Sequence, residues 1–241
     1  MAGRVHIGTS GWHYQHWKGV FYPEGMKNAD QLTFYAKQFD TVELNNSFYR
    51  LPAENTFRQW REATPDTFLF SVKAHRRITH FRKLSSVTDY TAEFVQRASL
   101  LQQKLGPILF QLPPKWKSNP AVLSDFAGSL PAGHRYVFEF RDPSWYNDTV
   151  YDILRRHDCA FCIYELAGHL SPVEATASFT YVRLHGPGDK YQGSYPDETL
   201  TTWASHCQSW RNAGLDVFIY FDNDQHAYAA DNAKRLSALI P

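Results

Sequence analysis

Short runs of apolar residues alternate with segments of helical periodicity along nearly the whole chain. Each run is bounded by turn-forming residues, which is typical of consecutive parallel βα units. We count eight runs, the number of strands in a closed (β/α)8 barrel. The predicted strands are 5–8, 41–45, 67–73, 108–112, 136–141, 159–165, 179–185 and 217–222.

Apolar residues at helical spacing predict the crossover helices. One stripe recurs from Tyr90 to Leu105, where Gly106-Pro107 is expected to end the helix, and another runs from Leu200 to Trp210. Between the sixth and seventh strands, residues 167–178 leave too little chain for a full crossover helix, so we expect a short or missing one. Further helices are predicted over 29–39, 54–63, 119–130, 147–157 and 226–239.

Nothing in this alternation indicates a second domain. The chain lacks a low-complexity tract, a Gly/Ser linker and a long-period repeat, and 241 residues suit one α/β barrel with one core. We therefore predict a single α/β TIM-barrel domain over residues 1–241.

Composition limits the location and the partners. The 25 Lys and Arg against 24 Asp and Glu give a net charge of +1, so no overall field attracts nucleic acid or a membrane. The three cysteines form no disulfide framework, which favours a reducing, cytoplasmic compartment. Cys159 and Cys162 lie three apart on a predicted strand, so they are expected on opposite faces. Without a signal peptide pattern or a long apolar run, no membrane partner is expected.

Polar residues gather at the carboxyl ends of the predicted strands. In a (β/α)8 barrel, alternate strand residues point inward, and catalytic groups come from these ends. On the fifth strand Glu139 and Arg141 share one face, while Phe138 and Phe140 share the other, which the helices should cover. The same alternation places further polar residues inward: Glu43, Asn45, Ser71, Lys73, Gln111, Glu165, Arg183, His185, Tyr220 and Asp222.

Such a ring has two interpretations. Its acids and bases can pair and merely plug the barrel, because buried charges need partners. Buried ion pairs are nevertheless often no more stabilising than packed apolar side chains, so a large ring is a poor device for stability alone. We therefore predict a functional pocket at the C-terminal rim.

The mixture of groups predicts acid/base chemistry on an anionic or hydroxylated substrate. The predicted catalytic residues are Glu43, Glu139, Glu165, Asp222 and His185. Fixed positive charge suits a phosphate, a carboxylate or a developing oxyanion. The predicted substrate-binding residues are Lys73, Arg141, Arg183, Asn45, Gln111, Trp12, Tyr49, Trp145, Tyr220 and Asn223.

A metal and a covalent lysine are the chemical alternatives. A divalent metal has acceptable ligand types in the ring, but the interleaved cations would repel it, so neither metal ligands nor a cofactor are predicted. Lys73 could form a Schiff base if its pKa were lowered. The carboxylates facing it favour a raised pKa and a role as a charge partner.

The loops after the strands are aromatic and basic. Residues 12–22 hold five aromatic side chains, which either stack on sugars or bases or form a small loop core. A basic run covers residues 75–83 on the same side, where it would fit an anionic ligand. Nucleic acid is therefore an alternative partner.

Seven blocks together resemble the domain of unknown function 72 family, also called YecE-like. They are IGTSGWHYQHWKGVFYP, VELNNSFYRLP, SVKAHRRITHF, LGPILFQLPP, FEFRDPSWY, RLHG and IYFDNDQHAYAADNA, and they cover nearly the whole chain. The resemblance implies a TIM barrel and no established activity. It also implies a likeness to the xylose isomerase and endonuclease IV group of barrels, which suggests a sugar or phosphodiester ligand by analogy.

The leading hypothesis is an enzyme of hydrolase, lyase or isomerase type that acts on a phosphate-bearing or polyhydroxylated substrate. Lys73, Arg141 and Arg183 would hold the substrate, with Glu139 and a second carboxylate as acid and base. The alternatives are a nucleic-acid-binding protein and a non-catalytic sensor of a small molecule. The oligomeric state is not readable from the sequence.

Overall fold

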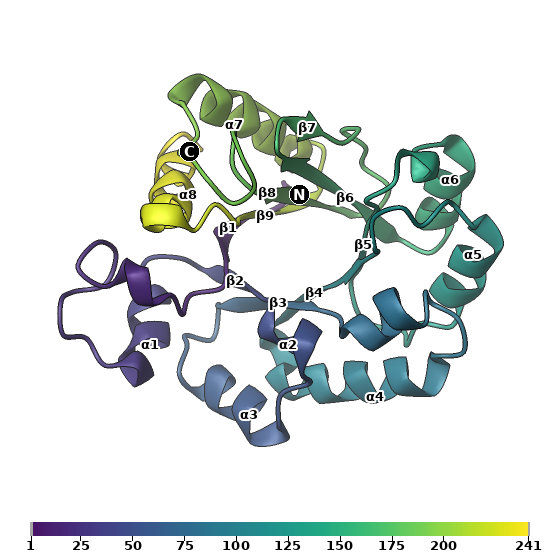
Figure 1. Cartoon of the computed structure of the whole chain (residues 1–241), viewed down its shortest axis with the longest axis horizontal. Helices are drawn as coiled ribbons and strands as arrows, with labels where there is room; N and C mark the ends of the chain where they lie inside the picture. The colour runs from purple at the N-terminus through teal and green to yellow at the C-terminus, as the bar shows by residue number, and fades with distance from the viewer. Residues whose placement is uncertain (1, 241) are drawn as a thin grey trace.

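Eight parallel strands close into a barrel surrounded by helices in the computed structural model, which describes residues 2–240 (Figure 1). The strands follow one another around the ring in chain order, and β5 pairs with β6 to close it. The predicted (β/α)8 TIM barrel is therefore confirmed. The parallel strands are β1 (Val5–Ser10), β2 (Thr41–Leu44), β3 (Leu69–Lys73), β4 (Leu105–Gln111), β5 (Tyr136–Glu139), β6 (Cys159–Leu166), β8 (Phe179–Leu184) and β9 (Asp216–Phe221).

The helices lie in most of the predicted places. Asparagines cap two of them, because Asn119 accepts from the Val122 amide and Asn147 from the Val150 amide. The α-helices are α1 (Gln31–Tyr35), α2 (Asn46–Tyr49), α3 (Glu54–Glu62), α4 (Thr88–Ala98), α5 (Pro120–Gly128), α6 (Asp148–Arg156), α7 (Asp197–Asn212) and α8 (Tyr228–Ala238). Short 3-10 turns precede α1 and α8, at Asn28–Asp30 and Gln225–Ala227, so these α-helices begin later than predicted.

The prediction that a helix runs to Leu105 and stops at Gly106-Pro107 is wrong. Helix α4 ends at Ala98, a 3-10 segment follows over Ser99–Lys104, and Leu105 begins β4. Gly106 and Pro107 lie inside β4, where the register with β3 shifts. A Cβ on Gly106 would lie 3.1 Å from the Phe70 carbonyl oxygen, so the glycine lets the two strands approach closely.

The missing crossover helix is confirmed. In the described chain, β6 leads into a hairpin with the short antiparallel β7 (His169–Leu170), and irregular backbone then reaches β8. A five-residue π-helix over Arg77–Phe81, which the sequence pattern did not predict, follows β3.

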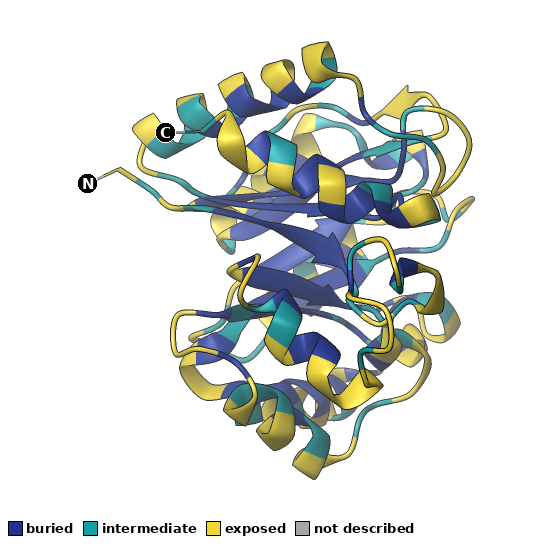
Figure 2. Cartoon of the chain, turned by 90° about the vertical axis from the view of Figure 1, so that its left-hand side faces the viewer, coloured by how far each residue is buried: buried dark blue, intermediate teal, exposed yellow. Residues whose placement is uncertain are grey.

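Buried side chains form an outer layer between the strands and helices and an inner layer inside the barrel. Figure 2 shows the buried strands at the centre and the exposed outer faces of the helices. Cys159 belongs to the outer layer and Cys162 to the inner one, so their predicted opposite orientation is confirmed. Across residues 2–240, the helices are each too short or too polar to span a bilayer.

Candidate functional site

Arg183 lies at the centre of the C-terminal end of the barrel, 1 % exposed. Its guanidinium donates to three carboxylates that come from three other strands. The Nη1 atom lies 2.8 Å from Glu139 Oε2, and Nη2 lies 2.8 Å from Glu43 Oε1 and 3.1 Å from Asp222 Oδ2. The predicted gathering of charged residues at this end of the barrel is therefore present, with Arg183 as its hub.

Glu43 is held ionised at neutral pH in this cluster. Burial alone would raise its pKa, but the charge and hydrogen bonds of Arg183 outweigh burial and hold the pKa below its usual value. Ser10 Oγ donates to Oε1, and Tyr181 Oη donates to Oε2 at 2.6 Å. These bonds fix the carboxylate, so Glu43 is poorly suited to transfer a proton.

Glu139 is held in the same way. Burial opposes its charge, yet the cations of Arg141 and Arg183 keep its pKa far below the usual range. Arg141 Nε donates to Oε1, and the Arg141 guanidinium carbon lies 4.4 Å from the centre of the Tyr164 ring. Arg141 is thereby oriented at the mouth of the barrel, with its side chain 9 % exposed.

His185 is neutral and has a defined tautomer. Burial, followed by the charges of Arg183 and Arg141, lowers its pKa well below the usual value. Nδ1 lies 3.0 Å from the carbonyl oxygen of Glu165, so this nitrogen carries the proton and donates. Nε2 is left as an acceptor, 2.9 Å from Arg183 Nη1 and 3.1 Å from Arg141 Nη2.

Lys73 is a cation of the cluster whose head group contacts an aromatic ring instead of a carboxylate. Among the described residues its ammonium has no hydrogen-bond or ion-pair partner, and Nζ lies 4.5 Å from the centre of the Phe48 ring. Burial and the charge of Arg183 lower its pKa to about 8, although three carboxylates oppose this shift. The expectation of a raised lysine pKa is therefore wrong, because burial and the neighbouring arginine outweigh the carboxylates.

Asp222 titrates near neutrality. Burial raises its pKa to about 7 even though Arg183 and Lys73 favour its charged form. Its Oδ2 also lies 3.4 Å from His185 Nε2. Two groups at the mouth of the barrel, Lys73 and Asp222, can thus exchange a proton near pH 7 to 8, whereas Glu43 and Glu139 cannot.

Ser10 and Tyr181 belong to the site but were not predicted. Ser10 is 1 % exposed, donates to Glu43 and receives a hydrogen bond from Asn45 Nδ2. Strand β1 extends two residues beyond its predicted end at Gly8, and continued alternation from His6 would have placed Ser10 inward. The same alternation places Tyr181, two residues before Arg183, on the inward face. It was not predicted as a site residue because an aromatic side chain at an inward position is also typical of a barrel core.

Glu165 does not point into the barrel, so its prediction as a member of the ring is wrong. The inward residues of β6 are Ala160, Cys162 and Tyr164, which pack in the inner layer. The Glu165 side chain lies on the opposite face, where it hydrogen-bonds Tyr195 and burial raises its pKa. Strand β6 is apolar on both faces, so its sequence pattern carried no indication of orientation.

Three predicted substrate-binding residues are fully buried and hold the structure together. Tyr220 lies deeper in the barrel, with its hydroxyl 2.7 Å from Thr41 Oγ1. Trp145 stacks on Phe140 at 4.7 Å and donates to the Trp116 carbonyl, beneath the loop after β5. Asn223 donates to the Gly193 carbonyl at 2.7 Å. None of the three can contact a ligand at the mouth, which corrects those predictions.

The remaining predicted binding residues surround the mouth at different distances from Arg183. Gln111 is half-buried at the end of β4 beside Glu139. Trp12 and Asn45 line a cavity next to the cluster. Tyr49 is 64 % exposed, and its ring lies 5.8 Å from the Arg76 guanidinium carbon.

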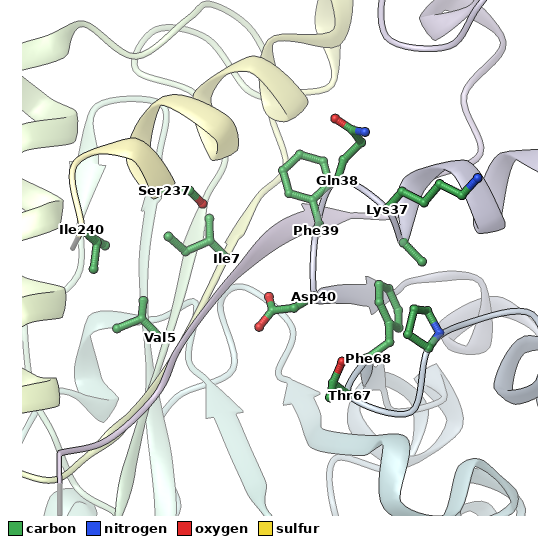
Figure 3. Close-up of a pocket in the computed structure, with 12 residues that line it drawn as sticks. Val5, Ile7, Lys37, Gln38, Phe39, Asp40, Thr67, Phe68, Ser237 and Ile240 are labelled. Atoms are coloured by element: carbon green, nitrogen blue, oxygen red, sulfur yellow. The ribbon is translucent and has the colours of Figure 1, made fainter.

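Two cavities differ in their relation to this cluster. The cavity in Figure 3, about 420 Å³, is lined by the start of β1, the segment before β2 and the end of α8, at the opposite end of the barrel. Residues at that end of a TIM barrel usually serve stability. The second cavity, about 720 Å³, lies beside the mouth and includes Trp12, Tyr14, Asn45 and Trp60.

The donor set of the cluster does not suit a metal ion. Across residues 2–240, no group of three or more His, Cys, Asp or Glu side chains is arranged as a metal site. Glu43, Glu139 and Asp222 each direct an oxygen at Arg183 instead. A divalent cation placed among them would meet that arginine.

The fold and the cluster define a TIM-barrel protein with a polar site at the C-terminal mouth. The chain belongs to the family described as "Protein of unknown function DUF72", whose model matches residues 6–241. The protein YunF of Bacillus subtilis is 26% identical over 98% of this chain and 94% of its own length. Escherichia coli YecE is 32% identical over a match that covers 59% of this chain and 50% of YecE.

A solved structure of a relative has the same fold. The crystal structure of a DUF72 family protein from Thermotoga maritima superposes with a TM-score of 0.88 at 28% identity. The match covers 98% of both chains. The resemblance found in the seven sequence blocks is therefore confirmed at the level of the family, for which no function is described.

Proposed function

We propose that the chain is an enzyme that carries out acid/base chemistry on a phosphate-bearing or polyhydroxylated substrate at the C-terminal mouth. The observation that supports this proposal is Lys73, a half-buried lysine at the mouth with a pKa of about 8, whose ammonium has no hydrogen-bond or ion-pair partner among the described residues. A stabilising charge would be expected to be paired, whereas a catalytic acid or base needs a pKa near the working pH and a free head group.

The surrounding residues divide into fixed charges and titrating groups. Arg183, Glu43 and Glu139 remain ionised and keep the geometry of the mouth. Arg141 and protonated Lys73 supply positive charge for an anionic group or a developing oxyanion. Asp222 has a pKa of about 7 and acts as the second proton carrier. When Asp222 is protonated, the three cations Arg183, Arg141 and Lys73 outnumber the two ionised carboxylates Glu43 and Glu139. The mouth then carries a net positive charge, which favours an anionic substrate.

The proposal is tested by turnover of a panel of sugar phosphates, nucleotides and free sugars. Lys73→Arg keeps the charge but cannot release its proton at neutral pH. On the substrate that wild type converts, it should keep KM within about threefold and lose roughly 100-fold or more in kcat. Lys73→Met should raise KM as well, because it also removes the charge.

The pH profile separates a proton carrier from a charge partner. The kcat/KM of wild type, which reports the free enzyme, should change through limbs near pH 7 and 8, set by Asp222 and Lys73. Lys234→Met, on α8, removes a lysine that lies over Phe21 in the outer layer and should leave kcat unchanged. A Lys73→Arg protein with the kcat and pH profile of wild type would exclude the proposed role of Lys73.

A nucleic-acid-binding function is favoured by one separate surface. The guanidinium carbon of Arg76 lies 5.8 Å from the Tyr49 ring and 5.3 Å from the Phe81 ring, and both rings are more than 60 % exposed. Exposed aromatic rings with a basic side chain between them stack bases and contact phosphates. Affinity for a short single-stranded oligonucleotide should fall steeply with salt and after Phe81→Ala. Binding that is absent or insensitive to salt removes this alternative.

A further inference from the structure

The cavity beside the mouth differs in chemistry from the mouth itself. About 720 Å³ in volume, it is within the size range of small-molecule sites, roughly 300 to 1,000 Å³. Its lining contains no Asp, Glu, Lys or Arg among the residues that the structure describes. The His13 imidazole, four side-chain amides and three aromatic rings line it instead. The amides and aromatic rings are those of Asn28, Asn45, Asn46, Gln59, Trp12, Tyr14 and Trp60. We call this the amide–indole cavity.

Two tryptophans form an apolar corner in this cavity. The Trp12 and Trp60 rings meet edge to face, with centroids 5.6 Å apart and planes at 90°. Trp60 packs against the rings of Phe57 and Phe70, whose centroids lie 5.4 Å and 6.4 Å from its own. The corner is therefore rigid, and each indole remains half-buried rather than covered. A rigid aromatic surface of this kind suits a flat ring.

The amides give the cavity a hydrogen-bonding pattern. Each carboxamide offers a donor and an acceptor in one plane, which matches the adjacent donor and acceptor on the edge of a nucleobase. Gln59 and Asn46 are exposed, whereas Asn45 is half-buried. The Asn45 Oδ1 atom is buried and receives no hydrogen bond within the described structure. An uncharged ring with its own donors fits this lining better than an anion does.

The cavity shares a wall with the charged cluster. Asn45 Nδ2 donates to Ser10 Oγ, which in turn donates to Glu43. Tyr14 also lines the cavity, and its pKa is raised by burial and by the charges of Asp222, Asp224 and Glu43. Figure 1 shows α1, α2 and α3 gathered at the side of the barrel formed by β1 to β3. The cavity therefore adjoins the charged cluster through Asn45 and Tyr14.

We propose that the amide–indole cavity binds the base of a nucleoside monophosphate whose phosphate lies at Lys73 and Arg141. This inference rests on the proposed function for the anionic end only, because the base is held by a separate set of residues. It narrows the substrate class to a nucleotide. The base stacks in the corner of Trp12 and Trp60, and the side-chain amides form hydrogen bonds with its edge.

The test measures binding of AMP, adenosine, ribose 5-phosphate and inorganic phosphate by calorimetry. AMP should bind at least about tenfold more tightly than any of the other three, because it alone occupies both ends. Trp60→Leu should weaken AMP and adenosine by about tenfold and leave inorganic phosphate unchanged. Gln59→Leu, at an exposed position, should weaken the same two ligands and is a variant that keeps the packing.

Two controls separate this inference from the proposed function. Trp210→Leu, on α7, should bind every ligand as wild type does. Lys73→Met should weaken AMP and inorganic phosphate and leave adenosine unchanged, which tests the anionic end alone. If the Trp60 and Gln59 variants bind AMP as wild type does, or if ribose 5-phosphate binds as tightly as AMP, the base site is refuted. Loss of phosphate affinity in Lys73→Met would still support the proposed function.

Discussion

At the scale of single residues, Arg183 organises the site. Its side chain is 2 % exposed, and it pairs at once with carboxylates from β2, from β5 and from the residue that follows β9. A buried ion-pair network contributes little net stability compared with packed apolar residues, but removing one partner leaves the others charged and unpaired. Arg183 therefore fixes the positions of the surrounding acids, and its own donors are taken up by them rather than by a substrate.

Arg183→Met should destabilise the protein by roughly 3 to 5 kcal/mol, because Glu43 would be left as a buried, unpaired charge and Glu139 would keep only Arg141 as its ion-pair partner. Denaturant unfolding measures this loss. Arg235→Met is the matched control, since Arg235 pairs with Asp197 and Asp231 at the surface and should cost no more than about 1 kcal/mol. Equal losses in the two variants would show that Arg183 is not the hub.

The Lys73 amine should titrate near pH 8 in a 13C NMR experiment that follows its Cε resonance. Asp222→Asn should lower that pKa further, because the charge of Asp222 favours the protonated amine. Lys73→Arg removes the resonance and so assigns it. A midpoint near 10, the value of an unperturbed lysine, would contradict the desolvated environment.

At the scale of elements, the loop between β8 and α7 connects to the site through its backbone. The Tyr191 amide donates to the His185 carbonyl at 2.7 Å, and the Tyr191 and His185 rings lie 5.7 Å apart. Asn223 and Asn232 secure the loop by bonds to the Gly193 carbonyl and the Tyr195 amide. Asn223 is therefore needed for the loop that borders the mouth, although it contacts no ligand there.

Gly186→Ala should disrupt this loop. Gly186 has a φ of +109°, and a Cβ there would lie 2.3 Å from the Gln192 carbonyl oxygen. The strain should cost about 1 to 3 kcal/mol and raise hydrogen exchange over residues 186–195. Gly188→Ala, where a Cβ meets nothing within 4 Å, should stay within about 0.5 kcal/mol of wild type. Identical exchange in the two variants would contradict this account.

At the scale of the whole molecule, the cluster links stability to pH. Glu43 and Glu139 have lower pKa values in the folded chain than in the unfolded one. Their stabilisation is complete above the unfolded value, about 4.3, and is lost as the pH falls below it. Asp222 acts in the opposite sense, because its raised pKa favours the folded state at low pH and this benefit is lost as the pH rises through about 7.

The Tm of wild type should therefore fall steeply between about pH 4.3 and pH 2, and Glu139→Gln should flatten that slope by removing one shifted carboxylate. Differential scanning calorimetry at a series of pH values measures both. Glu54→Gln removes an exposed carboxylate of α3 and should keep the slope of wild type. If the Glu139 and Glu54 variants gave the same slope, the cluster would not control acid stability.

The sequence by itself determined the barrel, because strand and helix periodicities are local and repeat eight times. It also determined most of the site, since alternation along β5, β8 and β9 brings Glu139, Arg183 and Asp222 to one end. Only the tertiary structure showed that Glu165 faces outward, because a strand buried on both faces has no polar side to indicate its orientation.

The tertiary structure also decided which charges can titrate. Lys73, Glu139 and Asp222 have ordinary pKa values in an unfolded chain. In the folded chain burial shifts the pKa of all three, Arg141 and Arg183 lower that of Glu139, and the charge of Arg183, far away in sequence, also acts on Lys73 and Asp222. The amide–indole cavity likewise combines the loop after β1 with α3. Periodicity reports the face of each element, whereas pKa shifts and cavities depend on distances between elements, which are set only when the barrel closes.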